Sequence, residues 1–271
     1  KYNERLNRIK TAVELGKPDR VPMVFMGDAF CVRHMNVKMS RFCTDPEFSN
    51  QTIIDSFTAL GDIDGSEEAF VFLPALSAKF FLKVKIAGFE LKEGELWQFD
   101  EQELMTPEDY DRIIEKGFES FRVEFWRKHL DNVEEKLQKL GTIVPKCINN
   151  MVNAGLVPYA PVYANVPSDT ISGGRSMAKY MKDLYKMPDK VQEVQDIIHR
   201  ENMETFRKQI RAFKPFAVFV GAARGASEFY SPKLWHRYIG PYIKQIVEMV
   251  VEEGAVAHLH FDSNWERDLD F

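Results

Sequence analysis

Two apolar segments near the end of the chain, each followed by polar residues, constrain the fold more than any other feature. Residues 216–220 read FAVFV and residues 255–261 read AVAHLHF, and both have the length and composition of buried strands. Between them, Ser231 and Pro232 begin a helix that ends at Gly254. Strand, polar loop, helix and strand in this order predict neighbouring parallel strands in an α/β fold.

The earlier part of the chain repeats this organisation less clearly. Residues 1–16 have the spacing of an amphipathic helix, and 21–26 read as a buried strand. Residues 79–105 alternate in a β-like way and predict a hairpin or flap insertion. Residues 142–148 are expected to form another strand. We therefore predict one domain over residues 1–271, a (β/α)8 TIM-type barrel.

Length and composition exclude several classes of protein. A chain of 271 residues can form one barrel or two small domains. Its net charge of -5 gives no electrostatic reason to expect nucleic acid or an anionic membrane as a partner, and no apolar run is long enough to span a bilayer. Cys31, Cys43 and Cys147 are odd in number and lack a CxxC pair, which indicates free thiols and a cytoplasmic protein.

The segment 256–262 carries the strongest chemical pattern. Side chains alternate along a strand, so His258, His260 and Asp262 share one face with Val256. Two imidazoles and a carboxylate at the C-terminal end of a barrel strand can bind a metal or move protons. The alternative is a buried histidine bonded to a carbonyl group and an aspartate that caps the next helix.

Other candidate residues also follow predicted strands or loops. Asp28 follows the strand 21–26 and belongs either to a site or to a turn. Arg224 and Glu228 follow the strand 216–220, where the alternative is a surface ion pair. Asp169 lies in a proline-rich loop region, before a Gly-Gly-Arg sequence that lacks the spacing of a phosphate-binding loop.

Four stretches in fixed order resemble the uroporphyrinogen decarboxylase superfamily. They are residues 17–22 (KPDRVP), 184–191 (LYKMPDKV), 229–242 (beginning FYSPKLW and ending PY) and 253–260 (EGAVAHLH). Together they span nearly the whole chain. The resemblance implies a (β/α)8 barrel. It also implies that roughly the last quarter of the barrel lies beyond Phe271, so we expect the barrel to be truncated at its C-terminal end.

The resemblance separates two chemistries. True decarboxylases of this superfamily carry an arginine-rich signature near the N-terminus that grips substrate carboxylates, whereas residues 21–30 here contain no arginine. Corrinoid-dependent methyltransferases of the superfamily hold zinc with a His-x-Cys pair on a late strand. His260 matches that histidine and Asp262 replaces the cysteine, so these two residues are the expected zinc ligands.

The resemblance therefore implies a zinc-dependent methyltransferase that exchanges a methyl group with a cobalamin-carrying partner protein. The other substrate would be a small O- or S-methyl compound, or a thiol or folate acceptor. We assign catalytic roles to Asp28 and Glu228, and substrate contacts to Arg224, Asp169 and His258. The alternatives are uroporphyrinogen decarboxylase, with Asp28 stabilising the pyrrole nitrogens, and a non-catalytic binding module for a tetrapyrrole or a corrinoid protein. Whether the chain forms a homodimer stays open.

Overall fold

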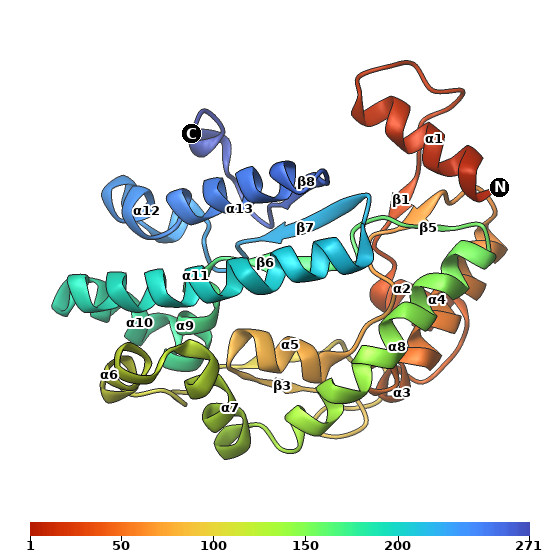
Figure 1. Ribbon diagram of the computed structural model, residues 1–271. Coiled ribbons are helices and arrows are strands. Elements are labelled where there is room, and N and C mark those ends of the chain that lie inside the picture. The colour runs from red at the N-terminus through yellow and green to blue at the C-terminus, as the bar shows by residue number, and fades with distance from the viewer. The chain divides into compact units, whose positions relative to one another are not determined.

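The computed structural model describes the whole chain, Lys1–Phe271. It is an α/β structure with parallel strands, as predicted (Figure 1). The chain forms two compact units, one made of residues 1–75, 84–98 and 135–161, the other of residues 76–83, 99–134 and 162–271. The closure of a (β/α)8 barrel and the single-domain organisation stay predictions.

The first unit contains a three-stranded parallel sheet in the order β1–β2–β5, with Phe25 paired to Ser66 and Ser66 to Pro158. Its strands are β1 (Val24–Phe25), β2 (Gly65–Ser66) and β5 (Val157–Pro158). Its helices are α1 (Tyr2–Val13), α2 (Asp28–His34), α3 (Met39–Thr44), α4 (Pro46–Leu60) and most of α8 (Val133–Asn153). The strand predicted at 21–26 is therefore present as β1.

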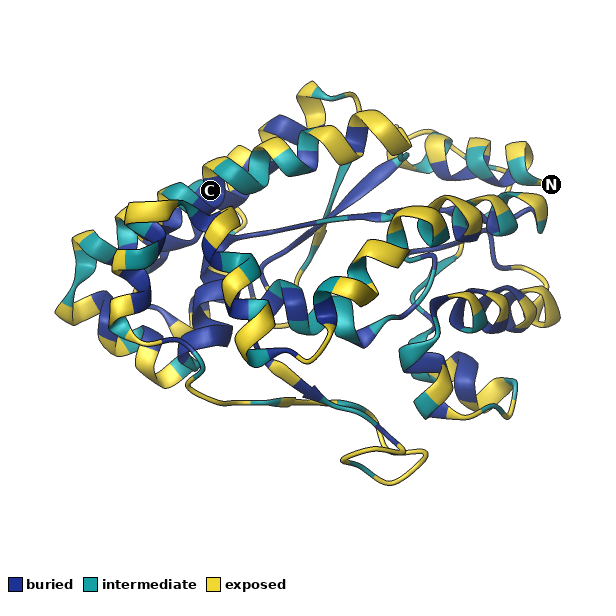
Figure 2. Cartoon of the chain, turned by 60° about the horizontal axis from the view of Figure 1, so that its bottom comes forward, coloured by how far each residue is buried: buried dark blue, intermediate teal, exposed yellow.

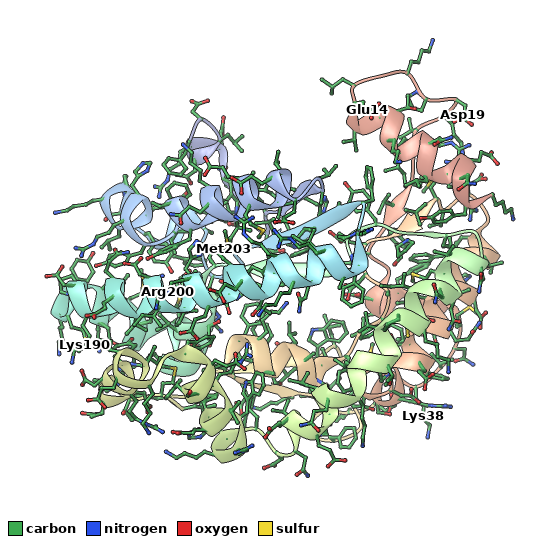
Figure 3. All side chains as sticks on the ribbon, viewed as in Figure 1. Glu14, Asp19, Lys38, Lys190, Arg200 and Met203 are labelled. Atoms are coloured by element: carbon green, nitrogen blue, oxygen red, sulfur yellow. The ribbon has the colours of Figure 1, made fainter.

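A buried carboxylate joins α1 to the sheet of the first unit. Asp64 is fully buried, and its Oδ1 accepts hydrogen bonds from Arg8 at 2.6 Å and from Arg20 at 2.8 Å. Arg8 also donates to Asp19, which lies in the link after α1 (Figure 3). Because Asp19 and Arg20 belong to the stretch KPDRVP, that motif has a structural role here.

The strand predicted at residues 142–148 is wrong, because these residues lie inside α8. Ile143, Cys147 and Met151 follow one another at intervals of four, which is the spacing of a helix face. Cys147 and Met151 are fully buried. Pro145 lies inside the helix without ending it, so burial of this apolar face outweighs the hydrogen bond that a proline cannot make.

The segment predicted as a hairpin or flap contains two short strands. β3 (Lys83–Lys85) and β4 (Gln98–Asp100) form a two-stranded sheet. Gly88 and Gly94, in the connection between them, have positive φ angles of 78° and 91°, which favour glycine.

The second unit contains the other parallel sheet, in the order β6–β7–β8. Its strands are β6 (Val162–Asn165), β7 (Ala217–Gly221) and β8 (Val256–His260), so the strands predicted at 216–220 and 255–261 are present. Its helices are most of α5 (Leu73–Phe80), α6 (Pro107–Lys116), α7 (Phe118–His129), α9 (Pro167–Arg175), α10 (Met177–Lys186), α11 (Pro188–Phe213), α12 (Pro232–Tyr238) and α13 (Gly240–Glu252), with 3-10 turns η1 (Ser227–Phe229) and η2 (Glu266–Asp268).

Helices α11 and α13 pack on one face of this sheet, because each connects two neighbouring parallel strands (Figure 1). On α11, Val191, Val194 and Ile198 form the buried stripe, while Arg200 is exposed. Figure 3 labels Arg200 on this helix. β7 is buried along its length, and α9 is buried throughout. Figure 2 shows other helices with one buried and one exposed side. No helix of the chain is long and apolar enough to cross a membrane.

Candidate functional site

The C-terminal ends of β6, β7 and β8 lie in register. Asn165 is paired with Gly221, and Gly221 with His260. The residues that leave these strands therefore start from one edge of the sheet: Asp169 in the first turn of α9, Arg224 in the loop after β7, and Asp262 directly after β8. Parallel α/β folds place their chemistry at this edge.

A row of stacked rings crosses the face of the sheet that α11 and α13 do not cover. The Tyr163 and Phe219 rings are 4.6 Å apart with an interplanar angle of 16°, and the Phe219 and His260 rings are 4.9 Å apart at 30°. Lys79 of α5 places its Nζ 3.5 Å from the centre of the Tyr163 ring. The His258 ring lies 6.0 Å from Phe219 on the same face. The sequence predicted the two histidines but not the row that supports them.

The predicted metal ligands His260 and Asp262 are brought together. The Nε2 atom of His260 lies 2.7 Å from Oδ1 of Asp262, a direct hydrogen bond. The two side chains are 32% and 60% exposed, so a small molecule can reach them. No group of three or more His, Cys, Asp or Glu side chains that could hold a metal ion is present in the chain.

Asp169 is fully buried behind the strand ends. Its Oδ1 accepts a hydrogen bond from the backbone N–H of Arg224 at 2.9 Å, while its Oδ2 has no hydrogen-bond partner. Burial raises the pKa of Asp169 to about 7, although hydrogen bonds from the backbone of Arg224 and Ala223 and the charge of Arg224 oppose the rise. This carboxyl group holds the loop after β7 against α9.

The loop after β7 is anchored by residues of the stretch FYSPKLW. The Tyr230 hydroxyl donates to the carbonyl oxygen of Arg224 at 2.9 Å, and the Trp235 indole N–H donates to that of Gly225 at 3.0 Å. Both side chains are buried. This motif therefore fixes the backbone that carries Arg224.

The guanidinium group of Arg224 is already engaged. It forms an ion pair with Glu101 at 2.6 Å and donates to the carbonyl oxygen of Ser172 at 3.2 Å. Glu228, in η1, is exposed. Their assigned roles in substrate binding and catalysis stay predictions.

Asp28 lies in the first unit, at the start of α2 after β1. Burial raises its pKa, a hydrogen bond with Glu68 opposes the rise, and the neighbouring charge of Glu67 adds to it. Since Glu67 and Glu68 follow β2, the neighbour of β1, three carboxyl groups gather at the C-terminal ends of these two strands. β2 has only two residues, which is too short for a recognisable strand pattern, so the approach of Glu67 and Glu68 to Asp28 could not be predicted from the sequence.

Comparison with known proteins gives a structural match. No family model matches the sequence, and no curated protein matches it. The chain is similar in structure to a methyltransferase from Methanosarcina mazei, with a TM-score of 0.66 at 12% sequence identity. The match covers 96% of this chain and 70% of that protein. At this identity the similarity shows a shared fold.

Proposed function

We propose that the chain is a methyltransferase whose reacting groups lie at the C-terminal ends of β6, β7 and β8. The observation that carries the proposal is the structural similarity to the Methanosarcina mazei methyltransferase over 96% of the chain. The methyl group would pass between a small O- or S-methyl compound, or a thiol or folate acceptor, and a cobalamin carried by a partner protein. We infer these substrate classes from the resemblance of the sequence motifs to the uroporphyrinogen decarboxylase superfamily.

The chemistry of the site supports this proposal. Methyl transfer to a thiol or hydroxyl requires a group that takes a proton from the acceptor, and imidazole is well suited near neutral pH. His260 and His258 place two imidazoles on the face of β8 that lies beside Phe219. Asp28 belongs to the first unit, so its assigned catalytic role stays a prediction and no step at the ends of β6, β7 and β8 is assigned to it.

Zinc at His260 and Asp262 is an incomplete fit. Catalytic zinc in proteins has three protein ligands, whereas the chain brings together two candidate donors. These two are bonded to each other at 2.7 Å, so Nε2 of His260 already has a partner. Zinc therefore stays a proposal that needs a further ligand, and no step of the reaction is assigned to it.

The arginine contacts favour methyl transfer over decarboxylation of uroporphyrinogen. Such a substrate carries several carboxylates that need cationic partners. Arg175 is buried and bonded to Asp183 at 2.8 Å and Glu103 at 2.5 Å, and Arg224 is paired with Glu101. Both guanidinium groups are therefore already neutralised by carboxylates of the chain, which weakens their attraction for the carboxylates of a substrate.

The experiment is a methyl-transfer assay with free cobalamins. The purified protein is incubated with methylcobalamin and 2-mercaptoethanol, and separately with reduced cobalamin and methyl ethers or thioethers, while the visible spectrum of the corrin is followed. We expect demethylation or methylation above the rate with heat-denatured protein. Formation of coproporphyrinogen from uroporphyrinogen, with no methyl transfer in either assay, would contradict the proposal. Binding of a tetrapyrrole or corrinoid without either turnover would favour a binding module.

A further inference from the structure

We propose that Asp262 is a positioning residue for His260, and that Nδ1 of His260 takes the proton from the methyl acceptor. This inference rests on the proposed function and gives the two residues separate roles. In the alternative, both side chains bind one metal ion as equal ligands. The contacts around His260 distinguish between these arrangements.

The hydrogen bond to Asp262 fixes the tautomer of His260. An ionised carboxylate only accepts hydrogen bonds, so the nitrogen facing it must carry the hydrogen. That nitrogen is Nε2, 2.7 Å from Asp262 Oδ1. In the neutral imidazole the other nitrogen, Nδ1, then has a free lone pair. The bond to Asp262 engages Nε2, and the His260 side chain is 32% exposed, so we assign the Nδ1 lone pair to the substrate.

Stacking fixes the plane of the same ring. Phe219 lies 4.9 Å from the His260 ring at 30°, and Phe219 is itself buried and stacked on Tyr163. The ammonium group of Lys79 lies over the Tyr163 ring. The imidazole is therefore held on its face by the aromatic row and on its Nε2 edge by Asp262. Such support from neighbouring groups keeps a reacting side chain in one orientation.

Methyl transfer with this arrangement balances without an external oxidant or reductant. The acceptor, a thiol or hydroxyl compound, gives its proton to Nδ1 of His260. Its sulfur or oxygen forms a bond to the methyl carbon with the electron pair that is freed. The bond between the methyl carbon and the donor breaks, and its electron pair leaves with the donor. The imidazolium that forms is stabilised by the Asp262 carboxylate, as in other His–Asp pairs.

The first test is nuclear magnetic resonance of the imidazole nitrogens, which does not depend on activity. Protein with ¹⁵N-labelled histidine is measured at pH 8.5. The His260 signals are identified by their loss in His260→Gln. We expect a hydrogen-bonded Nε2–H with slowed exchange in the wild type, its loss in Asp262→Ala, and its return in Asp262→Glu. An Nδ1–H tautomer in the wild type, or an unchanged signal in Asp262→Ala, would overturn the inference.

Adding zinc to the same sample tests the alternative, in which His260 and Asp262 are both metal ligands. If one equivalent of zinc removed the Nε2–H resonance in the wild type but bound no longer to Asp262→Ala, both residues would be metal ligands and the positioning role would be wrong. We expect the resonance to persist when zinc is added. The readout is the same spectrum with and without the metal.

The second test is kinetic. In the methyl-transfer assay, Asp262→Ala should lower kcat roughly tenfold to hundredfold with little change in KM, and Asp262→Glu should recover part of the loss. An equal kcat in wild type and Asp262→Ala would overturn the inference. If the wild type transfers no methyl group at all, the proposed function fails, while the tautomer measurement still decides whether Asp262 positions His260.

Discussion

The buried carboxyl group of Asp169 should make the free energy of unfolding fall as pH rises through neutrality. Its pKa in the folded protein is about 7, against an ordinary value of 3.8, because the side chain is fully buried. Between pH 3.8 and pH 7 the Asp169 carboxyl group is protonated in the folded state and ionised in the unfolded state. Stability from this group is therefore fully present below about pH 4 and is lost as pH rises through 7.

The magnitude follows from the shift. Each pH unit in this window changes the free energy of unfolding by about 1.4 kcal/mol. From pH 5 to the folded-state pKa of about 7 the loss is about 2.3 kcal/mol, because the slope falls as the group titrates, and by pH 8 it reaches about 2.7 kcal/mol. Asp169→Asn removes the titration. It keeps a side-chain oxygen that can accept from the backbone N–H of Arg224.

The assay is urea unfolding between pH 5 and pH 8, followed by the fluorescence of the four tryptophans. The wild type should lose about 2.7 kcal/mol across this range relative to Asp169→Asn. His129 and His199, whose pKa values burial lowers, contribute equally to both proteins and cancel in the difference. Glu253→Gln is the control, since Arg211 and Arg207 hold the pKa of Glu253 at about 2, outside the range. Parallel curves for the wild type and Asp169→Asn would refute the reasoning.

Four further substitutions, one of them a control, test the packing by urea unfolding. Asp64→Asn should cost about 3 kcal/mol, because two arginines lose their charged partner; a cost below 1 kcal/mol would contradict this. Gly173→Ala should cost about 3 kcal/mol or more, since its Cβ would lie 1.7 Å from a backbone oxygen of α5, whereas Gly141→Ala meets no atom and should stabilise by about 0.5–1 kcal/mol. Equal effects of these two would refute the close contact. Trp235→Phe should cost about 1–2 kcal/mol by leaving the buried carbonyl oxygen of Gly225 unpaired, and an unchanged midpoint would refute that hydrogen bond.

The elements that were predicted correctly are mainly those whose hydrophobic pattern lies within a few consecutive residues. The run at 216–220 is uniformly apolar and ends at a glycine, and it forms β7. Residues 142–148 are also mostly apolar, yet they lie in α8, because the helical spacing of Ile143, Cys147 and Met151 extends beyond the short run. A short apolar run fits both a strand and a buried helix, so only the wider window could have separated the two.

The candidate site could be predicted where its residues lie on one strand. His258, His260 and Asp262 alternate along β8, so their common face follows from the sequence. The partners of His260 come from other elements: Phe219 from β7 and, further along the row, Lys79 from α5. The order of strand, helix and strand predicted that β7 and β8 are neighbours, but it contained no signal for their register, which decides which rings stack, or for the approach of α5.

The most direct test of the central claim compares two histidine variants in the methyl-transfer assay. His260→Ala removes the imidazole beside Asp262, and His236→Ala removes an exposed imidazole on α12 as a matched control. The measurement is the single-turnover rate of methyl transfer from methylcobalamin to a thiol, at matched folded fractions. We predict that His236→Ala stays within about twofold of the wild type and that His260→Ala loses roughly 10²–10⁴-fold, the range of general acid–base catalysis. Equal rates for the two variants would contradict a methyltransferase site at the end of β8.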